Sequence, residues 1–423
     1  MAFLAAAKLA GLLHDLGKYR FAFQEYLNVG DRARRSAETV HAIYRAAAGG
    51  VVWDGLAMAF AIAGHHAGLH DQDQLKMQIT NSKYQAMDRF PKLFSAADGN
   101  NELAGLLTEL RPKQEDASDS IARLEFDEDD ASDKRRFDVF VRMLFAILVD
   151  ADRLDSEKFE QEHRRQRAWE RPTRMLDATV LLDRLDAARR AKGAEKKESR
   201  PELNQLRDSV FEACRERGRN SHAGFFSLTV PTGGGKTISS MAFALEHAKA
   251  RELRRVIVVI PYLSIIEQNA RDYRMIFGAD QVLEHHSAVE VSQPMRPSDT
   301  DTEEPAQALD IERVMENWGV PIVVTTAVQF IETLFAASPA KARKLHNVAH
   351  SVVIFDEVQT LPTHLLEPTL DVLRTLQQHF GVSVLFCSAT GQSFICRRRC
   401  APRIGLTCWD SRRHRRRTIS SND

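Results

Sequence analysis

A glycine-rich turn followed by lysine and threonine is the most informative chemical feature of this sequence. Residues 226–237 read Phe-Ser-Leu-Thr-Val-Pro-Thr-Gly-Gly-Gly-Lys-Thr, so an apolar run leads directly into the turn. Backbone N–H groups of such a turn, at a helix N-terminus, surround phosphate oxygens. Lys236 would then reach the β- and γ-phosphates of a nucleoside triphosphate, and the Thr237 hydroxyl would bind Mg²⁺. The sequence therefore predicts an ATP site formed by Pro231, Thr232, Gly233, Gly234, Gly235, Lys236 and Thr237.

Two adjacent carboxylates close a second apolar run. Residues 351–357 read Ser-Val-Val-Ile-Phe-Asp-Glu, the pattern of a buried strand that ends in acidic residues. We expect Asp356 to hold Mg²⁺ through water, and Glu357 to act as the catalytic residue that orients or deprotonates the attacking water. Open parallel sheets bind their ligands at the carboxyl ends of the strands, which is where these two residues fall.

The elements that must position these groups are strands separated by helices. Further apolar runs of β type occur at residues 255–260, 322–325 and 383–387, with helix-length stretches between them. This alternation predicts a mainly parallel sheet covered by helices on both faces. We assign residues 204–390 to one α/β nucleotide-binding domain.

Composition limits the class of protein. The chain has 423 residues, 43% of them hydrophobic, and a formal net charge of zero, which argues against a generally basic nucleic-acid binder. Five cysteines give no disulfide framework and are typical of a reducing cytosol. No apolar run approaches the roughly 18 residues of a membrane helix. We therefore expect a soluble, cytoplasmic protein with no membrane partner.

The front half has a helical pattern and carries paired metal-ligand types. His14-Asp15 lies in Leu-Leu-His-Asp-Leu-Gly-Lys, and His65-His66 lies in Ala-Gly-His-His-Ala-Gly-Leu. Adjacent His-Asp on a helix can serve two neighbouring metals with a bridging carboxylate. Lys18 shares the helical face of Asp15 and can neutralise a phosphate, so Asp15 and Lys18 are predicted catalytic residues. Any single histidine, such as His70, is more simply a hydrogen-bonded structural group.

Two further residues would close the metal site. We expect His41 and Asp150 to complete the set from other helices, giving His14, Asp15, His41, His65, His66 and Asp150 as ligands. Asp152 competes for the last position, and Asp150 is favoured because it ends the helix predicted from about residue 137 to 149. This mixed nitrogen and oxygen set suits Mn²⁺, Ni²⁺, Fe²⁺ or Co²⁺. Such a metal lowers the pKa of bound water to roughly 7, which makes hydroxide available for phosphodiester hydrolysis.

The order of these motifs resembles a known family. An HD-type metal phosphohydrolase followed by a superfamily-2 helicase is similar to the helicase-nuclease of type I CRISPR interference systems. The resemblance covers nearly everything up to Thr390, and it includes Ile260-Pro261-Tyr262-Leu263-Ser264, Thr325-Thr326-Ala327-Val328-Gln329, Asp356-Glu357-Val358-Gln359 and Ser388-Ala389-Thr390. It implies an all-α HD domain followed by a RecA-like α/β domain with a mainly parallel sheet.

The resemblance also implies partners and roles. The protein would join an RNA-guided CRISPR surveillance complex that has opened a DNA duplex, translocate on the displaced single-stranded DNA with ATP and Mg²⁺, and cut it in the HD site. Six residues are carried over by position as DNA-binding or coupling residues. They are Pro261, Ser264, Thr325, Thr326, Ser388 and Thr390. Contacts of this kind read phosphate and sugar, so little sequence preference is expected.

The sequence departs from the family at both ends. The family takes its first metal ligand from a helix upstream of the His-Asp pair, and only thirteen residues precede His14. After Thr390 only 33 residues remain, too few for the second RecA-like domain that a helicase needs. Residues 391–423 hold nine arginines, no lysine and two acids, and they fit neither a helix nor a strand pattern. We interpret this basic tail as out of frame, and the chain as a fragment with impaired helicase activity.

The predicted domain organisation follows. Residues 1–185 form the HD-type nuclease domain without its N-terminal ligand helix, 186–203 a charged linker, 204–390 the first RecA-like domain and 391–423 the tail. Two alternatives stay open. One is an HD-type nucleotide phosphohydrolase with a regulatory ATPase-like domain, and the other is a non-catalytic remnant that binds DNA or the complex.

Overall fold

The computed structural model of the chain describes residues 2–14, 56–71, 73–75, 77, 130–164, 166, 169, 175–195, 201–286, 316–389 and 405–409. Its contacts divide the chain into two units. Unit 1 comprises residues 1–170 and Phe335–His346, and unit 2 comprises Arg171–Leu334 and residues 347–423. The predicted linker, 186–203, lies within unit 2, where its described residues are helical.

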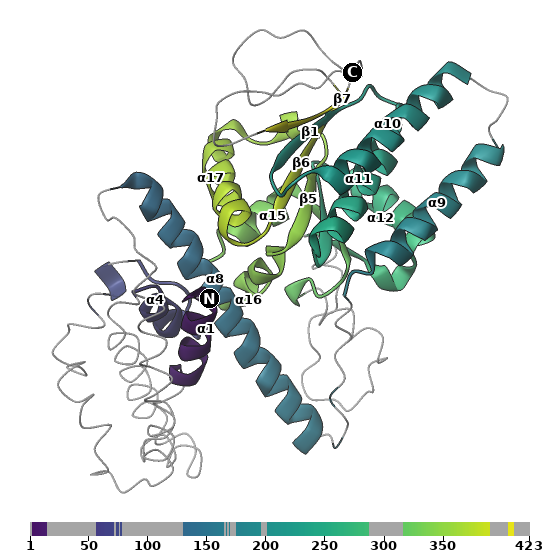
Figure 1. Cartoon of the computed structure of the whole chain (residues 1–423). Helices are drawn as coiled ribbons and strands as arrows, with labels where there is room; N and C mark the ends of the chain where they lie inside the picture. Colours follow the sequence, from purple (N-terminus) through teal and green to yellow (C-terminus); the bar gives the residue numbers. More distant parts are fainter. Residues whose placement is uncertain are drawn as a thin grey trace, which may run out of the picture. The chain divides into compact units, whose positions relative to one another are not determined.

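The predicted apolar runs form the central sheet of unit 2 (Figure 1). Its strands are β1 (Phe225–Thr229), β2 (Arg255–Ile260), β3 (Val282–His285), β4 (Ile322–Thr326), β5 (Ser351–Phe355), β6 (Ser383–Ser388) and β7 (Gly405–Trp409). They lie in the order β3-β4-β2-β5-β6-β1-β7. The pairs among β1 to β6 are all parallel. The predicted parallel α/β fold is therefore confirmed for this unit.

The last strand differs from the sequence-based expectation. β7 pairs antiparallel with β1, with Trp409 opposite Phe225 and Gly405 opposite Thr229. The expectation that the tail contains no strand is wrong for these five residues. The physical reason is that a strand edge offers unpaired N–H and C=O groups, which can accept a neighbouring strand whatever its wider composition.

Helices cover both faces of the sheet. On one face lie α9 (Ala178–Glu195), α10 (Pro201–Asn220), α11 (Lys236–Arg251) and α12 (Leu263–Phe277), and on the other α15 (Ala327–Leu334) and α17 (Thr363–His379) (Figure 1). Because strand side chains alternate, Val258 joins the core under the first group. Phe355 faces the other way, with its ring 5.4 Å from that of Phe330 in α15. Short 3₁₀ turns complete the connections at η6 (Ala279–Gln281), η7 (Leu345–Val348) and η8 (Val358–Thr360).

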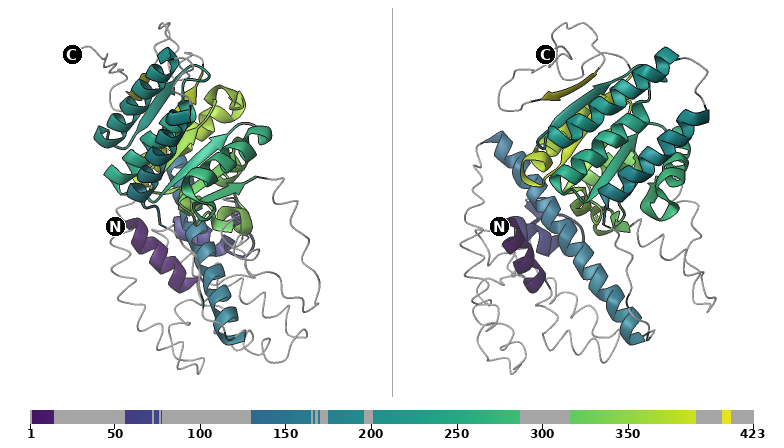
Figure 2. Two further views of the ribbon diagram at one scale, coloured as in Figure 1. Left: turned by 90° about the vertical axis from the view of Figure 1, so that its right-hand side faces the viewer. Right: turned by 45° about the vertical axis from the view of Figure 1, so that its right-hand side comes forward.

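α10 and α11 run side by side in close contact (Figure 2). Gly218 permits it, because a Cβ there would lie 2.6 Å from the carbonyl oxygen of Phe243 and 3.1 Å from the amide nitrogen of His247. Any larger residue would push the two backbones apart. The close approach keeps α11, which follows the glycine-rich turn, fixed against its neighbour.

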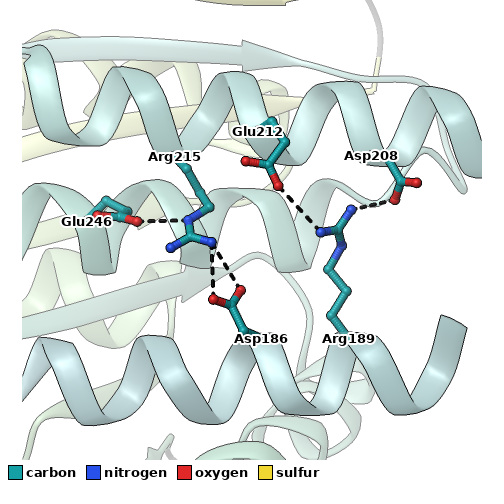
Figure 3. Close-up of polar contacts among 6 residues, drawn as sticks. All are labelled: Asp186, Arg189, Asp208, Glu212, Arg215 and Glu246. Carbon is teal, nitrogen blue, oxygen red and sulfur yellow. Dashed lines mark hydrogen bonds and ion pairs between the residues drawn. The ribbon is translucent and has the colours of Figure 1, made fainter.

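A network of ion pairs joins α9, α10 and α11 (Figure 3). Arg215 of α10 lies between Asp186 of α9, at 3.1 Å, and Glu246 of α11, at 2.8 Å. Glu246 is 4% exposed and also contacts Arg219 at 3.2 Å. Arg189 of α9 contacts Asp208 and Glu212 on the exposed side of α10. Charge therefore holds the three helices together at a buried point and at an exposed one.

We predict that Glu246→Ala lowers the free energy of unfolding by about 2–3 kcal/mol. Removing Glu246 takes the buried carboxylate away from both Arg215 and Arg219, so Arg215 retains only its weaker acidic neighbours such as Asp186. Denaturant unfolding of the purified chain measures the change. The matched control is Asp208→Asn, which removes an exposed partner from the same network and should cost less than about 1 kcal/mol. Equal costs for the two variants would contradict the assignment.

His247 on α11 is a buried, neutral histidine. It is fully shielded from solvent, and its ring nitrogens lie 3.1 Å from the carbonyl oxygen of Gly218 and 2.9 Å from the hydroxyl of Ser383 on β6. Burial lowers the pKa of His247 to about 4. The ring thus ties α11 to α10 and to the sheet, and it resists protonation while the chain is folded.

Folding should therefore weaken on acidification. Below pH 6.5 the unfolded His247 takes up a proton, whereas the folded residue does so only near its pKa of about 4. We predict that this residue accounts for a loss of about 2 kcal/mol of unfolding free energy between pH 7 and pH 5. The His247→Gln variant should lose about 2 kcal/mol less unfolding free energy than the wild type between pH 7 and pH 5. Parallel pH profiles for the two proteins would overturn the prediction.

The described residues of unit 1 are helical. They form α1 (Ala2–Leu13), α4 (Leu56–Gly64), α8 (Ala131–Phe159), a π-helical turn η5 (Glu160–Arg164) and α16 (Pro339–Ala342). The predicted helix from about 137 to 149 is the middle of α8, which extends further at both ends. At its start Asp130 caps it, accepting a hydrogen bond from Ser132 N at 2.6 Å. α1 and α4 pack along α8, as Figure 2 shows. Asp150, 4% exposed, lies on the buried side of α8 and within the helix, so the expectation that it ends this helix is wrong.

Candidate functional site

The predicted phosphate-binding turn connects β1 to α11 at the carboxyl end of the sheet. Gly233 and Gly235 have φ of 82° and 86°, values that disfavour side chains. A Cβ on Gly234 would lie 2.5 Å from the Val230 side chain, so glycine is needed there for space. No atom lies within 4 Å of a Cβ built on Gly233, so the turn is open on that side. The backbone has the shape of an anion cradle.

The first turn of α11 adds positive potential to this cradle. Gly235 is the N-cap and makes no side-chain cap, so the helix begins with Lys236 and Thr237 directly behind the turn. Helix N-termini carry a partial positive charge and unpaired N–H groups. These residues fit a nucleotide phosphate and a hydroxyl-bound Mg²⁺.

The two carboxylates lie beside the lysine. Asp356 and Glu357 follow β5, whose end is held by the hydrogen bond from Asp356 N to Val259 O at 2.9 Å. Lys236 Nζ lies 3.0 Å from Asp356 Oδ1 and also contacts Glu357 Oε1. The structure thus brings together residues 120 positions apart in the sequence, as the strand pattern predicts. Lys236 is therefore ion-paired with both carboxylates.

Electrostatics favour the charged forms of this group. Burial lowers the pKa of Lys236, but its contacts with Glu357 and Asp356 outweigh burial and raise it. Burial raises the pKa of Glu357, but hydrogen bonds from Lys236 and Gln359 outweigh burial and lower it. A carboxylate that stays ionised can accept a proton from water or bind a cation through water. Both behaviours suit the predicted roles.

Glu357 also links two strand ends. Its φ of 46° is in the left-handed region, a strained setting for a residue with a side chain. Gln359 Nε2 donates to Glu357 Oε2 at 2.6 Å, and the backbone N–H of Ala389 hydrogen bonds to the same carboxylate. Ala389, the residue after β6, is therefore hydrogen-bonded to Glu357, the acidic residue after β5. Ser388 is buried and its carbonyl accepts from Val230 N at 3.2 Å, while Thr390 lies outside the described residues.

One residue of this site has no sequence signal. Arg207 of α10 donates from Nε to the carbonyl oxygen of Gly233 at 2.8 Å, and its Cγ would lie 3.3 Å from a Cβ on Gly235. It steadies the turn from a helix that precedes β1. Arginine on a charged helix is common, so sequence pattern alone gives no reason to select it.

The predicted DNA-contact residues lie at neighbouring strand ends. Pro261 follows β2 and Thr326 ends β4, and these strands are adjacent and parallel. Thr325 is fully buried, and its hydroxyl donates to His285 O at 2.9 Å; the Thr326 hydroxyl accepts from Gln329 N at 3.2 Å. Ser264 lies in the first turn of α12, and its side chain is outside what the structure describes. Both described threonine hydroxyls therefore serve the local backbone.

Two histidines of unit 1 approach each other from different helices. His14 follows α1 and His65 follows α4, and their rings are 5.1 Å apart. Each Nδ1 lies 2.7 Å from the carbonyl oxygen three residues earlier, so Nδ1 carries the hydrogen and the lone pair is on Nε2. Metal-binding histidines usually donate their other ring N–H in this way. His66 lies with its ring 4.0 Å from that of His65 and is exposed.

The two candidate aspartates on α8 have different partners. Asp152 Oδ1 lies 3.7 Å from His14 Nε2. Asp150 accepts from Arg343 Nε at 2.9 Å and lies 3.4 Å from His346 Nε2. A nitrogen and an oxygen on one metal, with bonds of about 2.1 Å, lie about 3.0–3.4 Å apart, close to the His14–Asp152 spacing. Asp152 therefore lies beside His14, whereas Asp150 is paired with Arg343 and His346.

The other predicted ligands cannot be placed. Asp15, Lys18 and His41 lie outside the described residues. Among the residues that are described, no three histidine, cysteine, aspartate or glutamate side chains gather closely enough to hold a metal ion by themselves. Nor is any described helix both long and apolar enough to cross a membrane.

Comparison with known proteins identifies the class of unit 2. Residues 207–396 match the family model of DEAD/DEAH box helicases, the span that holds the phosphate-binding turn and the Asp-Glu pair. Among solved structures, the crystal structure of T. fusca Cas3 with AMPPNP has a TM-score of 0.52 at 16% identity, covering 91% of this chain and 44% of that one. At that identity the likeness concerns the fold. Residues 207–396 are thus similar in sequence to DEAD/DEAH box helicases.

Sequence relatives narrow that class. The CRISPR-associated nuclease/helicase Cas3 of Haloferax volcanii is 32% identical over 181 residues, covering 39% of this chain and 19% of that protein. A putative CRISPR-associated nuclease/helicase Cas3 of Methanocaldococcus jannaschii is 25% identical over 413 residues, covering 90% of this chain and 54% of that protein. The chain spans about a fifth and about half of these relatives. Its helicase region is Cas3-like.

We predict that Lys236→Ala weakens binding of a non-hydrolysable ATP analogue with Mg²⁺ by about 10- to 100-fold, since a charged hydrogen bond to phosphate contributes about 1.5–3 kcal/mol. Titration calorimetry on the whole chain measures the affinity. Lys249→Ala is the matched control, because Lys249 is exposed in the last turn of the same helix and should leave affinity unchanged. Similar affinities for both variants would remove the lysine from the site.

Proposed function

We propose that this chain is a CRISPR-associated nuclease-helicase that moves along single-stranded DNA with ATP and cuts it at a metal-dependent site. Two observations in one chain carry this proposal. Lys236 is paired with Asp356 and Glu357, and His14 lies 5.1 Å in ring distance from His65 and 3.7 Å from Asp152. The similarity to two CRISPR-associated nuclease/helicase Cas3 proteins, one of which aligns with 90% of this chain, supports it.

ATP would bind where the glycine-rich turn meets α11. The triphosphate would displace the two carboxylates as partners of Lys236, and Asp356 would then be released to hold Mg²⁺ through water, opposite the Thr237 hydroxyl. Magnesium would neutralise charge on the phosphates, a role suited to these oxygen donors. Glu357, with its lowered pKa, would orient or deprotonate the attacking water.

Single-stranded DNA would follow the ends of β2 and β4. Because the Thr325 and Thr326 hydroxyls serve the backbone, contacts there would come from backbone groups and from exposed side chains. Tyr262 is 54% exposed and Val328 is 66% exposed at these two strand ends. An exposed aromatic residue offers a face on which a base can stack regardless of its identity. The hydrogen bond between Ala389 and Glu357 supports a coupling role for the segment after β6.

Cleavage would take place at the histidine-carboxylate cluster of unit 1. His14, His65 and Asp152, joined by the predicted ligands His66, Asp15 and His41, make a nitrogen and oxygen set that fits Mn²⁺, Ni²⁺, Fe²⁺ or Co²⁺. When bound, the metal would supply hydroxide at neutral pH. Lys18 would neutralise the scissile phosphate. An RNA-guided surveillance complex that displaces one DNA strand would provide the substrate, and the free cysteines Cys214 and Cys387 are in keeping with a reducing cytoplasm.

We predict that the purified chain with Mn²⁺ or Ni²⁺ cleaves a fluorescently labelled single-stranded DNA, and that His65→Ala and Asp15→Ala each reduce the rate at least about 100-fold. Loss of a ligand should exceed the 10- to 100-fold effect of losing an outer contact. A gel-based cleavage assay measures the rates.

His70→Ala is the matched control, because it removes a histidine of the same segment that stands outside the cluster, and it should cleave normally. Free nucleotides form the competing substrate. Faster hydrolysis of nucleotides than of DNA would point to a nucleotide phosphohydrolase, and no metal binding or cleavage at all would point to a non-catalytic DNA- or complex-binding protein.

A further inference from the structure

One side of the phosphate-binding turn is held by a helix that comes before it in the sequence. Arg207 of α10 donates from Nε to the carbonyl oxygen of Gly233 at 2.8 Å. The Arg207 stem also packs beside Gly235, because a Cβ on that glycine would lie 3.3 Å from Arg207 Cγ and 3.7 Å from Arg207 Cβ. A single side chain thus contacts the first and the third glycine of the turn.

The Gly233–Gly234 peptide is held from both sides. No cis peptide bond occurs among the residues that the structure describes, so the C=O of Gly233 and the N–H of Gly234 point in opposite directions. Arg207 binds the carbonyl, and Pro231 O accepts from the N–H at 2.9 Å. This second hydrogen bond closes a four-residue turn whose third residue, Gly233, has the positive φ, 82°, that a type II turn requires. Rotation of the peptide would therefore break two hydrogen bonds.

Arg207 is itself held in place by its own helix. Asn204, one turn earlier, accepts from Arg207 Nη1 through Oδ1 at 3.3 Å, which orients the guanidinium. Leu206 and Val210, on either side of Arg207 in the sequence, pack in the core between these helices and the sheet. The close approach at Gly218 holds α10 against α11. The donor therefore belongs to the same packed frame as the helix that follows the turn.

A fixed turn matters most where the backbone is freest. Gly233, Gly234 and Gly235 are consecutive, and glycine loses more conformational freedom on ordering than any other residue. When the turn is ordered before the ligand arrives, that entropy is not lost on binding, and the affinity is higher. The Gly233 carbonyl is also held toward α10, so its negative end does not turn in among the N–H groups that would surround a phosphate.

We propose that Arg207 is a positioning residue of the ATP site, which acts by holding the Gly233–Gly234 peptide so that the turn is ordered before a triphosphate binds. This inference rests on the proposed ATP-binding function. The role belongs to the Nε–H group, because Nε is the atom that donates to the turn. Direct attraction of a phosphate would instead depend on the positive charge.

Three substitutions separate the donor from the charge. Arg207→Gln places an uncharged amide nitrogen on Cδ, where arginine has Nε, so a donor is kept at the same place. Arg207→Lys keeps the charge but has a methylene group there. Arg207→Met has an unbranched side chain with neither the donor nor the charge.

Titration calorimetry of the whole chain with a non-hydrolysable ATP analogue and Mg²⁺ measures the affinity of each variant. Arg207→Gln should bind within about threefold of wild type, whereas Arg207→Lys and Arg207→Met should each bind about 10-fold more weakly, the effect of losing one hydrogen bond from a charged donor. Denaturant unfolding reports whether each variant is folded. If Arg207→Met is unstable, the comparison of Arg207→Gln with Arg207→Lys decides alone.

Two results would overturn the proposal. Wild-type affinity in Arg207→Lys would show that binding does not need the Nε donor, and weak binding by Arg207→Gln would show that the charged guanidinium itself contacts the ligand. Arg217→Met is the matched control, because it makes the same change about 15 Å further along α10 and should leave affinity unchanged. Failure of the wild type to bind the analogue would overturn the ATP site itself, and this inference with it.

Discussion

The ion pairs between Lys236 and the carboxylates of Asp356 and Glu357 are the contacts on which the architecture of unit 2 converges. They join the start of α11 to the end of β5, and they exist because β1 and β5 run in the same direction and end at the same edge of the sheet. Glu357 passes the contact on to the backbone after β6. The Lys236 side chain, behind β1, is thus connected through Glu357 to the ends of β5 and β6. Through such contacts, ligand binding at the end of one strand can change the structure at the end of another.

Much of unit 2 follows from sequence pattern. Buried parallel strands are continuous apolar runs, so the run at residues 255–260 coincides with β2, and the other predicted runs differ from their strands by a residue or two. Glycine, lysine and acidic residues at strand ends identify the site for the same reason. β3 and β7 are the elements that pattern misses. β3 has only four residues and includes Glu284 and His285, and β7 depends on pairing with β1, a tertiary effect that local composition does not encode.

Unit 1 is less accessible to sequence reasoning. The histidine pairs reveal a class of chemistry, but spacing along the chain does not decide between Asp150 and Asp152. The structure pairs Asp150 with Arg343, which lies 193 positions away in the sequence. A neighbour of this kind has no local signature. Arg207, on the helix before β1, escapes notice for the same reason, since it acts on a backbone carbonyl of Gly233.

The antiparallel pairing of β7 with β1 has an evolutionary consequence. The ladder between them is made of main-chain groups, which every residue except proline supplies in full. The edge of β1 can therefore pair with another strand through main-chain hydrogen bonds alone, and this pairing depends little on the amino-acid sequence of that strand. Such a position tolerates drift that would be fatal among the central strands, where each side chain must fit between two layers of helices.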